Sequence, residues 1–230
     1  MRAAKQVRVL TVGDGDLSYS LALARAFGDQ LRLTATTLLS EAELLETYSG
    51  TAGCIAELQQ RGATLRYGVN ATALEAASPP LGQQDHVVFN HPHLGLADLE
   101  SVAAHARRHA VLVAHFLDSA ARLLAASEVV VGAGGPPRGG CIHLTLCGNQ
   151  PHAWSVAAHA VRLNLETVSA MCPSAPAALL HGRARAAALT PAASQPEWNA
   201  RRRFRDGTLG CKHWLSQYGY EHRRSEGTAT

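Results

Sequence analysis

The sequence predicts an α/β fold: a Rossmann-like, doubly wound and mostly parallel sheet with helices on both faces. Three observations carry this prediction. Short β-rich runs alternate with segments of helical periodicity along most of the chain. The length of 230 residues suits one domain with a modest appendage. The composition, 47% hydrophobic and 17% charged, provides a substantial core and argues against general disorder.

The expected elements follow one another in a regular order. Val7–Val12 is a short apolar run that ends at Gly13, as a buried parallel strand would. Apolar residues at helical spacing follow over 17–27, with Ser18 or Ser20 as the N-cap. Further strands are expected at 31–38, 64–67, 85–90, 141–146 and 165–170, and further helices at 41–61 (broken near 49–50), at 99–126 (one long or two shorter) and at 154–163.

Composition divides the chain into three segments. Residues 1–170 hold the alternating strands and helices and are predicted to form the core. Residues 171–200 are rich in Ala, Pro and Ser with little periodicity, which predicts a flexible linker or loop. Residues 201–230 form a basic, aromatic C-terminal segment that is predicted to complete or flank the core.

Cysteine usage and hydropathy exclude other classes of protein. The five cysteines are scattered without a C-x-x-C pair, which fits free thiols in a reducing compartment. No signal peptide is visible, and no apolar stretch approaches the length of a membrane span. We therefore expect a soluble, intracellular protein with no membrane partner. A monomer is favoured, and the oligomeric state stays open.

The loop GDGDLSYS, residues 13–20, is the first candidate for a ligand site. In doubly wound sheets ligands bind beyond the carboxyl ends of the strands, and Gly13 and Gly15 would let the backbone approach a ligand closely. Ser18 stands where a dinucleotide fingerprint needs its third glycine, which disfavours a nicotinamide-dependent oxidoreductase. Asp14 and Asp16 would repel a pyrophosphate but tolerate a zwitterion that carries an ammonium and a sulfonium. The alternative is a plain strand-to-helix turn.

Six segments in order along the chain share a pattern with one family. GDGDLSYSLALARAF (13–27) looks like G-E-G-[DN]-F-S-F-S-x-A-L-A, and LTATTLLSEAELLETY (33–48) is similar to [IL]-T-A-T-S-x-D-S-x-x-x-L-x-x-x-Y. FNHPH (89–93) looks like F-N-F-P-H. The remaining three segments are GATLRYGVNATAL, IHLTLCGNQPHAW and YGYEHRRSEG. Together they resemble the eukaryotic ribosomal-RNA uridine-N3 methyltransferase domains, which also occur fused to a ferredoxin-fold anticodon-binding domain.

The resemblance implies a fold of the class I methyltransferase type, S-adenosylmethionine as cofactor, and methylation of N3 of a uridine in RNA. Ribosomal RNA is favoured over transfer RNA, and residence in the nucleus or nucleolus over the cytoplasm. Asp14 would pair with the cofactor ammonium, and Asn70 and Ala71 would meet the adenine. The implied cofactor site is Gly13, Asp14, Gly15, Asp16, Ser18, Asn70 and Ala71. The implied base site is Asn90, His91, Pro92 and His93.

The sequence departs from the family pattern at the end of the second strand. The family's aspartate, which accepts hydrogen bonds from the ribose hydroxyls, is Leu39 here, and Ser40 or Glu41 would have to substitute for it. The aspartate of the adenine loop is Asn70, whose carbonyl oxygen can still accept a hydrogen bond from the adenine amino group. These departures support an alternative function, in which an impaired methyltransferase fold serves as an RNA- or ribosome-binding module.

Histidines are candidates for the base that accepts the uridine N3 proton. His91 and His93 lie in the predicted base site, and neutral imidazole can accept a proton at pH 7. The alternative is that both are polar loop residues bonded to backbone. No cysteine pair or third ligand joins these two histidines at a recognised spacing, so no metal is predicted.

The C-terminal segment interleaves cations with aromatic rings, a combination that suits RNA because arginines meet phosphates and rings stack on unpaired bases. The alternative is a solvated basic segment that Trp214 and Tyr220 anchor to the core. The predicted RNA-binding residues are Arg201, Arg202, Arg203, Arg205, Lys212, Trp214, Tyr220, Arg223 and Arg224.

Overall fold

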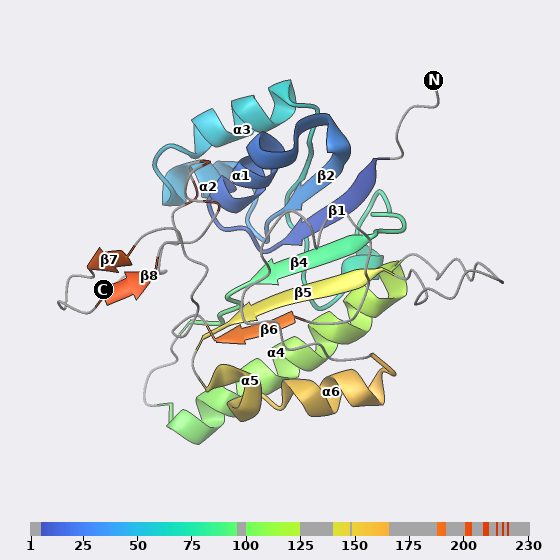
Figure 1. Cartoon of the computed structure of the whole chain (residues 1–230), viewed down its shortest axis with the longest axis vertical. Coiled ribbons are helices and arrows are strands. Elements are labelled where there is room, and N and C mark those ends of the chain that lie inside the picture. Colours follow the sequence, from blue (N-terminus) through green and yellow to red (C-terminus); the bar gives the residue numbers. More distant parts are fainter. Residues whose placement is uncertain are drawn as a thin grey trace.

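A parallel sheet forms the centre of the molecule, and Figure 1 shows it between two groups of helices. The computed structural model describes residues 6–95, 100–124, 140–147, 149–165, 188–191, 201–203 and 209–211, with Leu215, Tyr218 and Tyr220. The sheet has six strands in the order β3-β2-β1-β4-β5-β6, all parallel to their neighbours. The strands are β1 Val7–Val12, β2 Leu31–Thr36, β3 Thr64–Arg66, β4 His86–Asn90, β5 Cys141–Leu146 and β6 Ala188–Pro191. The strand order reverses between β1 and β4, so the loops that follow these two strands diverge and leave room for a ligand.

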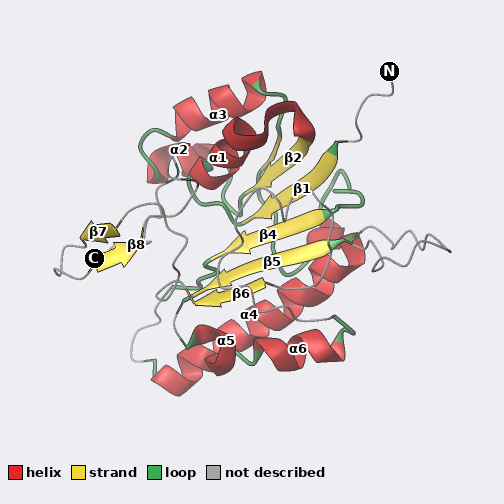
Figure 2. Ribbon diagram, viewed as in Figure 1, coloured by secondary structure: helices red, strands yellow, loops and turns green. Residues whose placement is uncertain are grey.

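Helices cover both faces of the sheet (Figure 2). The first group is α1 Ser18–Phe27, α2 Glu41–Thr47 and α3 Thr51–Gln60, and the second is α4 Val102–Leu123, α5 Gln150–Ala153 and α6 Val156–Arg162. Two short 3₁₀ turns, η1 Gly28–Gln30 and η2 Leu74–Ala76, complete the helical elements of the described residues. The predicted α/β fold with a mostly parallel sheet is therefore confirmed.

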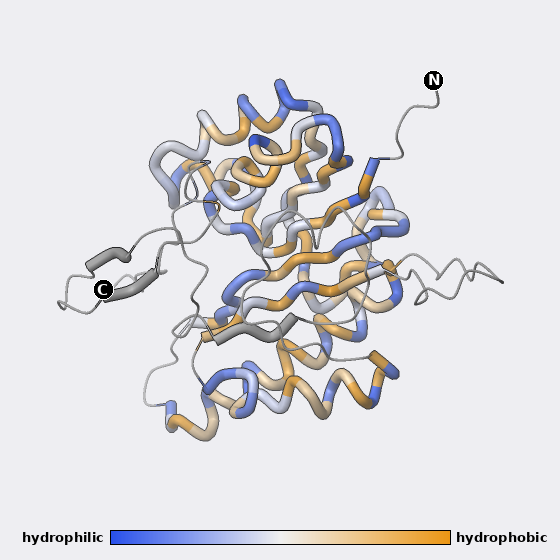
Figure 3. The backbone as a smooth tube through the Cα atoms, viewed as in Figure 1, coloured by the Kyte–Doolittle hydropathy of each residue, from blue (hydrophilic) through white to orange (hydrophobic). Residues whose placement is uncertain are grey.

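Alternation along the strands divides the core into two clusters, one on each face. Val9 packs with α1 and α3, while the neighbouring Leu10 packs with α4 on the opposite face. Figure 3 shows how predominantly hydrophobic the central strands are, as expected of strands that are covered on both sides. Phe116 of α4 is fully buried in the second cluster and meets Phe89 of β4 edge-on, with the ring centroids 4.8 Å apart.

The residues that follow the core were predicted less well. Residue 165 lies outside any strand, and residues 166–170, where a sixth strand was expected, fall outside the described residues. The sixth strand of the sheet is β6, within the stretch 171–200 that was expected to be a linker. Its four residues gain hydrogen-bonded pairing with β5, a tertiary interaction that composition does not reveal. The predicted loop at 132–140 lies outside the described residues except for Gly140.

The expected serine cap of α1 is also wrong. The helix begins after Leu17, which adopts φ +62°, and no side chain of the N-cap residue caps it. Asp14 takes that role instead, because its Oδ2 accepts the backbone N–H of Ser20 in the first turn. The long stretch 99–126 is one helix, α4, and Ser101 caps it by accepting the N–H of Ala104.

Part of the C-terminal segment lies within the described residues. β7 Arg201–Arg203 and β8 Leu209–Cys211 pair antiparallel as a separate two-stranded sheet. Leu215 and Tyr220 are buried in the cluster that contains α1. Within the described residues, no helix is both long and apolar enough to cross a bilayer.

Candidate cofactor and substrate cleft

A cleft of about 530 Å³ lies beyond the carboxyl ends of the central strands, at the point where the strand order reverses. The loops after β1, β2, β3 and β4 all contribute to it, as the convergence of these loops in a doubly wound sheet predicts. Three tyrosines, Tyr19, Tyr48 and Tyr220, add aromatic walls. The size fits one small-molecule cofactor or part of a larger substrate.

Two glycines form the wall of the cleft nearest to β1. Gly13 adopts φ +63°, and a Cβ atom there would lie 2.7 Å from Cε2 of Phe89. A Cβ at Gly15 would lie 3.0 Å from the hydroxyl of Tyr48. Both positions therefore need glycine, for conformation and space at Gly13 and for space at Gly15.

Asp14 lies at the bottom of the cleft and is tied to the start of α1. Its Oδ2 accepts hydrogen bonds from the backbone N–H of Ser20 at 2.7 Å and from the Ser20 hydroxyl at 2.6 Å. Burial raises the pKa of Asp14 to about 6, although both hydrogen bonds from Ser20 oppose the shift. A cationic ligand in the cleft would offset that penalty, so the site favours a positive group next to this carboxylate.

Asp16 and Ser18 bond to each other. Oδ1 of Asp16 accepts both the backbone N–H and the hydroxyl of Ser18, at 3.0 and 2.5 Å. Asp16 lines the cleft, whereas Ser18 is absent from its lining. The structure thus places Ser18 in support of the loop, at variance with its predicted contact with the cofactor.

Asn70 and Ala71 line the wall that follows β3. Oδ1 of Asn70 accepts the backbone N–H of Thr72 at 2.9 Å and its hydroxyl at 2.8 Å. Both lone pairs of the amide oxygen are therefore engaged locally. Asn70 was expected to accept a hydrogen bond from an adenine amino group, but its oxygen is engaged by Thr72, which leaves the donor group Nδ2 available to a ligand.

The end of β2 holds no carboxylate in the cleft. Leu38 is 64% exposed and lines the cleft, while Leu39 packs against the core cluster around α1. Ser40, expected to substitute for the ribose-binding acid, caps α2: its Oγ accepts the N–H of Glu43, and the Glu43 carboxylate accepts the N–H of Ser40. Ser40 does not line the cleft, because this capping box holds it at the start of the helix.

Asn90, at the end of β4, connects two walls of the cleft. Its Oδ1 accepts the Thr145 hydroxyl of β5 at 2.7 Å. Its side chain also forms a hydrogen bond with Tyr19. Burial raises the pKa of Tyr19 to about 12. Tyr19 meets Tyr220 edge-on with ring centroids 5.3 Å apart, so a continuous polar and aromatic wall runs from β5 to the C-terminal segment.

His91 and Pro92 follow Asn90 into the cleft. His91 adopts φ +47°, an uncommon conformation for a residue with a Cβ, and its N–H donates to Thr145 O at 2.9 Å. The imidazole Nδ1 lies 3.3 Å from Cys147 Sγ. Pro92 is buried beneath the loop.

His93 is the most exposed of the four predicted base-site residues. Its Nδ1 accepts the Gly95 N–H at 2.9 Å, and partial burial together with His105 and Arg108 lowers its pKa. His105 and His109 of α4 lie beside it, with ring centroids 5.5 and 5.0 Å away. α4 thus brings two imidazoles that are distant in sequence to His93, whereas His91 is not part of this group.

The charge in the cleft is negative. Asp14 and Asp16 line it, and none of the described residues that line it is a lysine or an arginine. A pyrophosphate would find no cation there, whereas a ligand with an ammonium and a sulfonium would find two carboxylates. The charges of the described lining residues therefore fit S-adenosylmethionine better than a dinucleotide.

The predicted RNA-binding residues are only partly described. Tyr220 is 7% exposed and lines the cleft, as in the alternative of an aromatic anchor. Arg201, Arg202 and Arg203 form β7, and the side chains of these residues are not described. Arg205, Lys212, Trp214, Arg223 and Arg224 lie outside the described residues.

Comparison with known proteins agrees with this site. Residues 10–172 match the profile of the BMT5-like family, described as rRNA (uridine-N3-)-methyltransferase BTM5-like. The chain belongs to the BMT5-like family. The matched region runs from within β1 to beyond β5, and it includes every described residue that lines the cleft except Tyr220.

Relatives share this BMT5-like region over part of their own length. The chain is 37% identical over 125 residues to heavy metal-associated isoprenylated plant protein 41 of Arabidopsis thaliana, covering 54% of this chain and 24% of that protein. It is 30% identical over 144 residues to the ferredoxin-fold anticodon-binding domain-containing protein 1 homolog of Mus musculus, covering 62% and 20%. The chain thus spans about a quarter or less of these two relatives.

Among solved structures, the BMT5-like chain is similar to BdcA from E. coli. The match covers 70% of this chain and 74% of that one, with 18% identity and a TM-score of 0.40. A likeness of this degree adds nothing to the fold that the sheet order already shows.

Several cleft residues were missed from the sequence. Tyr19 and Tyr48 lie on segments of helical periodicity as ordinary aromatic residues. Cys147, which contacts His91 but does not line the cleft, follows a strand as an isolated cysteine. Only the spacing of His105 and His109, four residues apart on a predicted helix, was a usable signal, since i and i+4 share one helix face.

Proposed function

We propose that this protein is an S-adenosylmethionine-dependent RNA methyltransferase that acts on N3 of a uridine in ribosomal RNA. Membership of the BMT5-like family supports the reaction class. The observation that carries the proposal for this chain is a cleft at the switch point of the sheet that presents two carboxylates and, among its described lining residues, no lysine or arginine.

The cofactor would occupy the part of the cleft between β1 and the loop after β3. Gly13 lines this part of the cleft without a side chain, so its backbone is open to the ligand, while Phe89 packs against its other side. Asp14 would face the ammonium, and Asn70 would donate to the adenine through Nδ2. When bound, S-adenosylmethionine supplies an electrophilic methyl group, and this chain needs mainly to orient the base and exclude water.

Asn90 and the two histidines would hold the uridine. The Asn90 amide is fixed by Thr145 and Tyr19, which pre-orients it to hydrogen-bond an imide edge. Pro92 closes the wall beneath the base. These contacts present the nucleophilic N3 toward the cofactor side of the cleft.

We assign the proton acceptor to His91 in preference to His93. In His93, Nδ1 already accepts the Gly95 N–H, so in the neutral ring Nε2 carries the proton and has no lone pair for a base to use. In His91, Nδ1 lies 3.3 Å from Cys147 Sγ, a contact in which either atom can donate, and the tautomer with its proton on Nδ1 leaves Nε2 as an acceptor. Proton removal by a positioned imidazole is worth about 100-fold or more in rate.

RNA would reach the cleft along the C-terminal segment. We propose that Arg201–Arg203, Arg205, Lys212, Trp214, Arg223 and Arg224 contact RNA, whereas Tyr220 serves as the buried anchor that ties this segment to the cleft. Arg25 of α1 supports the same attachment, because its guanidinium donates to Tyr218 O at 2.9 Å. Ribosomal RNA as substrate is in keeping with nucleolar residence.

The absence of a carboxylate at the end of β2 favours a second candidate. Leu38 occupies the cleft, Leu39 packs into the core and Ser40 is committed to its helix cap. A site without a ribose-binding acid fits an RNA- or ribosome-binding module whose methyltransferase fold has lost activity.

A methyl-transfer assay separates the two candidates. The purified chain is incubated with methyl-labelled S-adenosylmethionine and uridine-containing ribosomal RNA, and the modified nucleoside is identified by mass spectrometry. We expect N3-methyluridine, a decrease of about 100-fold in rate for His91→Gln, and no change for His115→Gln, an exposed histidine on α4. RNA binding without any methyl transfer would support the binding module and contradict the enzyme.

A further inference from the structure

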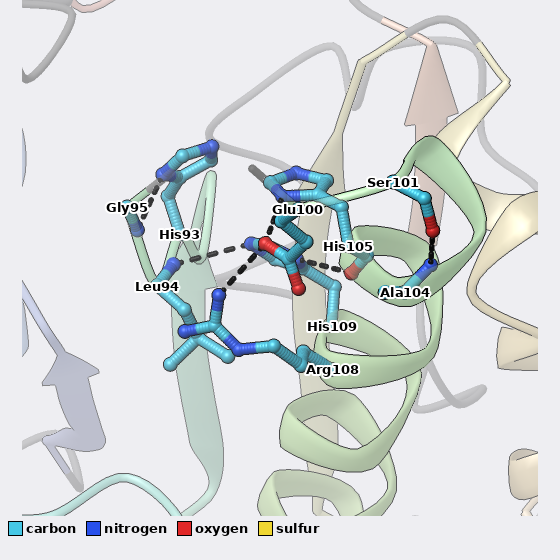
Figure 4. Close-up of polar contacts among 9 residues, drawn as sticks. All are labelled: His93, Leu94, Gly95, Glu100, Ser101, Ala104, His105, Arg108 and His109. Carbon is cyan, nitrogen blue, oxygen red and sulfur yellow. Dashed lines mark hydrogen bonds and ion pairs between the residues drawn. The ribbon is translucent and has the colours of Figure 1, made fainter. Parts of the chain in front are cut away.

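Three imidazoles converge at the rim of the cleft, on the side away from the carboxylates. His93 comes from the loop after β4, and His105 and His109 come from successive turns of α4 (Figure 4). Each ring offers a nitrogen, and the three nitrogens all lie within 4.8 Å of one another. Glu100 and Arg108, which are paired with each other at 2.9 Å, lie beside the imidazoles in Figure 4.

The ring of His109 is held in a fixed orientation. It stacks on Trp154 with ring centroids 4.5 Å apart and an interplanar angle of 21°. Its Nδ1 donates to the carbonyl oxygen of His105 at 2.9 Å, which leaves Nε2 as the acceptor. A histidine that metals bind at one nitrogen commonly donates its other N–H to a carbonyl in this way. Nε2 now accepts the Leu94 N–H at 3.1 Å, an interaction that an ion would replace.

His105 carries an unsatisfied polar atom. Its Nδ1 is buried and has no hydrogen-bond partner among the described residues. Glu100 Oε2 lies 3.4 Å from this nitrogen, and the Glu100 side chain is 7% exposed and paired with Arg108 at 2.9 Å. A buried carboxylate next to a histidine is the arrangement that orients metal-bound imidazoles and increases their basicity.

We propose that His93, His105 and His109 bind a divalent transition-metal ion of the Zn²⁺ class. Three imidazole ligands suit zinc, and a set of three protein ligands leaves the fourth position for water or a substrate atom. His93 is exposed, so an ion can enter from solvent. Tetrahedral zinc places its ligand nitrogens about 3.3 Å apart, so from separations of 4.8 Å or less the loop that carries His93 would need to close by at most about 1.5 Å.

Partial burial lowers the pKa of both His93 and His109, and each is affected by the neighbouring imidazole of His105. Neutral imidazole is the form that binds metals, and His93 would have to release the hydrogen bond that its Nδ1 accepts from Gly95 in order to bind an ion. The bound ion would join the loop of His91 and Pro92 to α4. It would thereby fix the wall of the cleft that faces the proposed base site.

A second cluster of ligand types is less suited to an ion. His86, Cys141 and His143 also lie close together on β4 and β5. His86 Nδ1 and His143 Nε2 already form a hydrogen bond of 2.9 Å, and His86 and Cys141 are buried in the sheet. This cluster is satisfied internally and lacks the solvent access of His93.

Metal titration of the purified chain tests the proposal without reference to methyl transfer. The chain is stripped with a chelator and titrated with Co²⁺, and Zn²⁺ is then used to displace the cobalt. We expect one equivalent of Co²⁺, visible absorption of tetrahedral type, and no thiolate-to-cobalt charge-transfer band. Zn²⁺ should raise the thermal unfolding midpoint.

Variants locate the ion. His93→Gln, on the exposed loop, and His105→Gln should each weaken Zn²⁺ binding by at least about tenfold and remove the thermal shift, while His115→Gln on the same helix retains both. Metal-free unfolding midpoints check that each variant is folded. No binding at micromolar Zn²⁺, a thiolate band, or unchanged binding by both His93→Gln and His105→Gln would overturn the proposal.

Discussion

Gly13 and Gly62 both have positive φ angles, but their surroundings differ. A Cβ at Gly13 would lie 2.7 Å from Phe89, which is itself packed against Phe116, whereas a Cβ at Gly62 would meet nothing within 4 Å. Gly62→Ala should therefore cost only the conformational penalty of about 1–2 kcal/mol, and Gly13→Ala should cost a further 1–3 kcal/mol or so from overpacking. Urea denaturation measures both, and equal losses would contradict the described contact.

Asp14 makes the stability of the fold depend on pH. Its pKa is about 6 in the folded protein and 3.8 without the influence of the fold, so the folded state holds more protons between these values. The free energy of unfolding should therefore fall as pH rises from about 4 to about 6, by about 3 kcal/mol from this group. Asp14→Asn keeps a hydrogen-bond acceptor for Ser20 and should flatten that decrease. Denaturation curves of both proteins at pH 4, 5, 6 and 7 measure the difference.

The same carboxylate should link cofactor binding to pH. A cation in the cleft stabilises ionised Asp14, so the affinity for S-adenosylmethionine should increase as pH rises through about 6 and then level off. Asp14→Asn should weaken binding and remove the pH dependence. Titration calorimetry at pH 5.5 and 7.5 distinguishes the two proteins, and identical pH profiles would show that Asp14 does not face the cation.

Leu38 and Leu39, at the end of β2 where the family has its ribose-binding aspartate, lie in different surroundings. Because Leu38 is exposed in the cleft, Leu38→Asp should supply a ribose-facing carboxylate and improve S-adenosylmethionine binding about tenfold. Leu39 packs against the core, so Leu39→Asp should lower stability without improving binding. Calorimetry and thermal unfolding of the pair measure both effects, and the reverse pattern would place the site on the other side of the strand.

At the residue scale, the predicted site residues divide into those that line the cleft and those that bond to a local partner. The motif positions Gly13, Asp14 and Asn90 do line the cleft. Ser18 and Ser40 do not, because each hydroxyl has a nearby carboxylate to bond, in Asp16 and in Glu43. A short polar side chain can form its hydrogen bond with a ligand or with a local partner, and one sequence alone does not reveal which of the two it bonds.

At the scale of the element, α2 provides a direct test of the role of Ser40. The capping box with Glu43 satisfies the helix start, so Ser40→Ala should lower the free energy of unfolding by about 1 kcal/mol. Affinity for S-adenosylmethionine should remain unchanged, since Ser40 lies outside the cleft. Paired denaturation and calorimetry measure the two quantities, and a loss of affinity with unchanged stability would restore Ser40 to the cofactor site.

Elements with strong periodicity were predicted closely. The strands β1 and β5 and the break between α2 and α3 lie where apolar runs and the Ser49–Gly50 pair place them. β6 was missed because its four residues lie in an Ala- and Pro-rich stretch. They form a strand because they pair with β5. The convergence of His93 with α4 was missed for a related reason, since the contact joins a loop to a helix a dozen residues away.

At the scale of the whole molecule, the sheet order assembles the site. The reversal between β1 and β4 brings the loops after β1, β2, β3 and β4 to one cleft. The sequence predicted a doubly wound sheet but not the specific strand order β3-β2-β1-β4-β5-β6. Strand alternation with helices predicts such a class because parallel strands need crossover connections. The topology therefore determines which loops meet at the cleft, but it does not determine the contacts that their side chains make.

Titration calorimetry of the purified chain with S-adenosylmethionine, with NADPH as the comparison ligand, is the most direct measurement. The two carboxylates of the cleft, and the absence of lysine and arginine among its described lining residues, predict micromolar binding of S-adenosylmethionine and no binding of NADPH. A folded sample that binds no S-adenosylmethionine, or that binds NADPH in its place, would contradict the assignment of this cleft as a methyltransferase cofactor site.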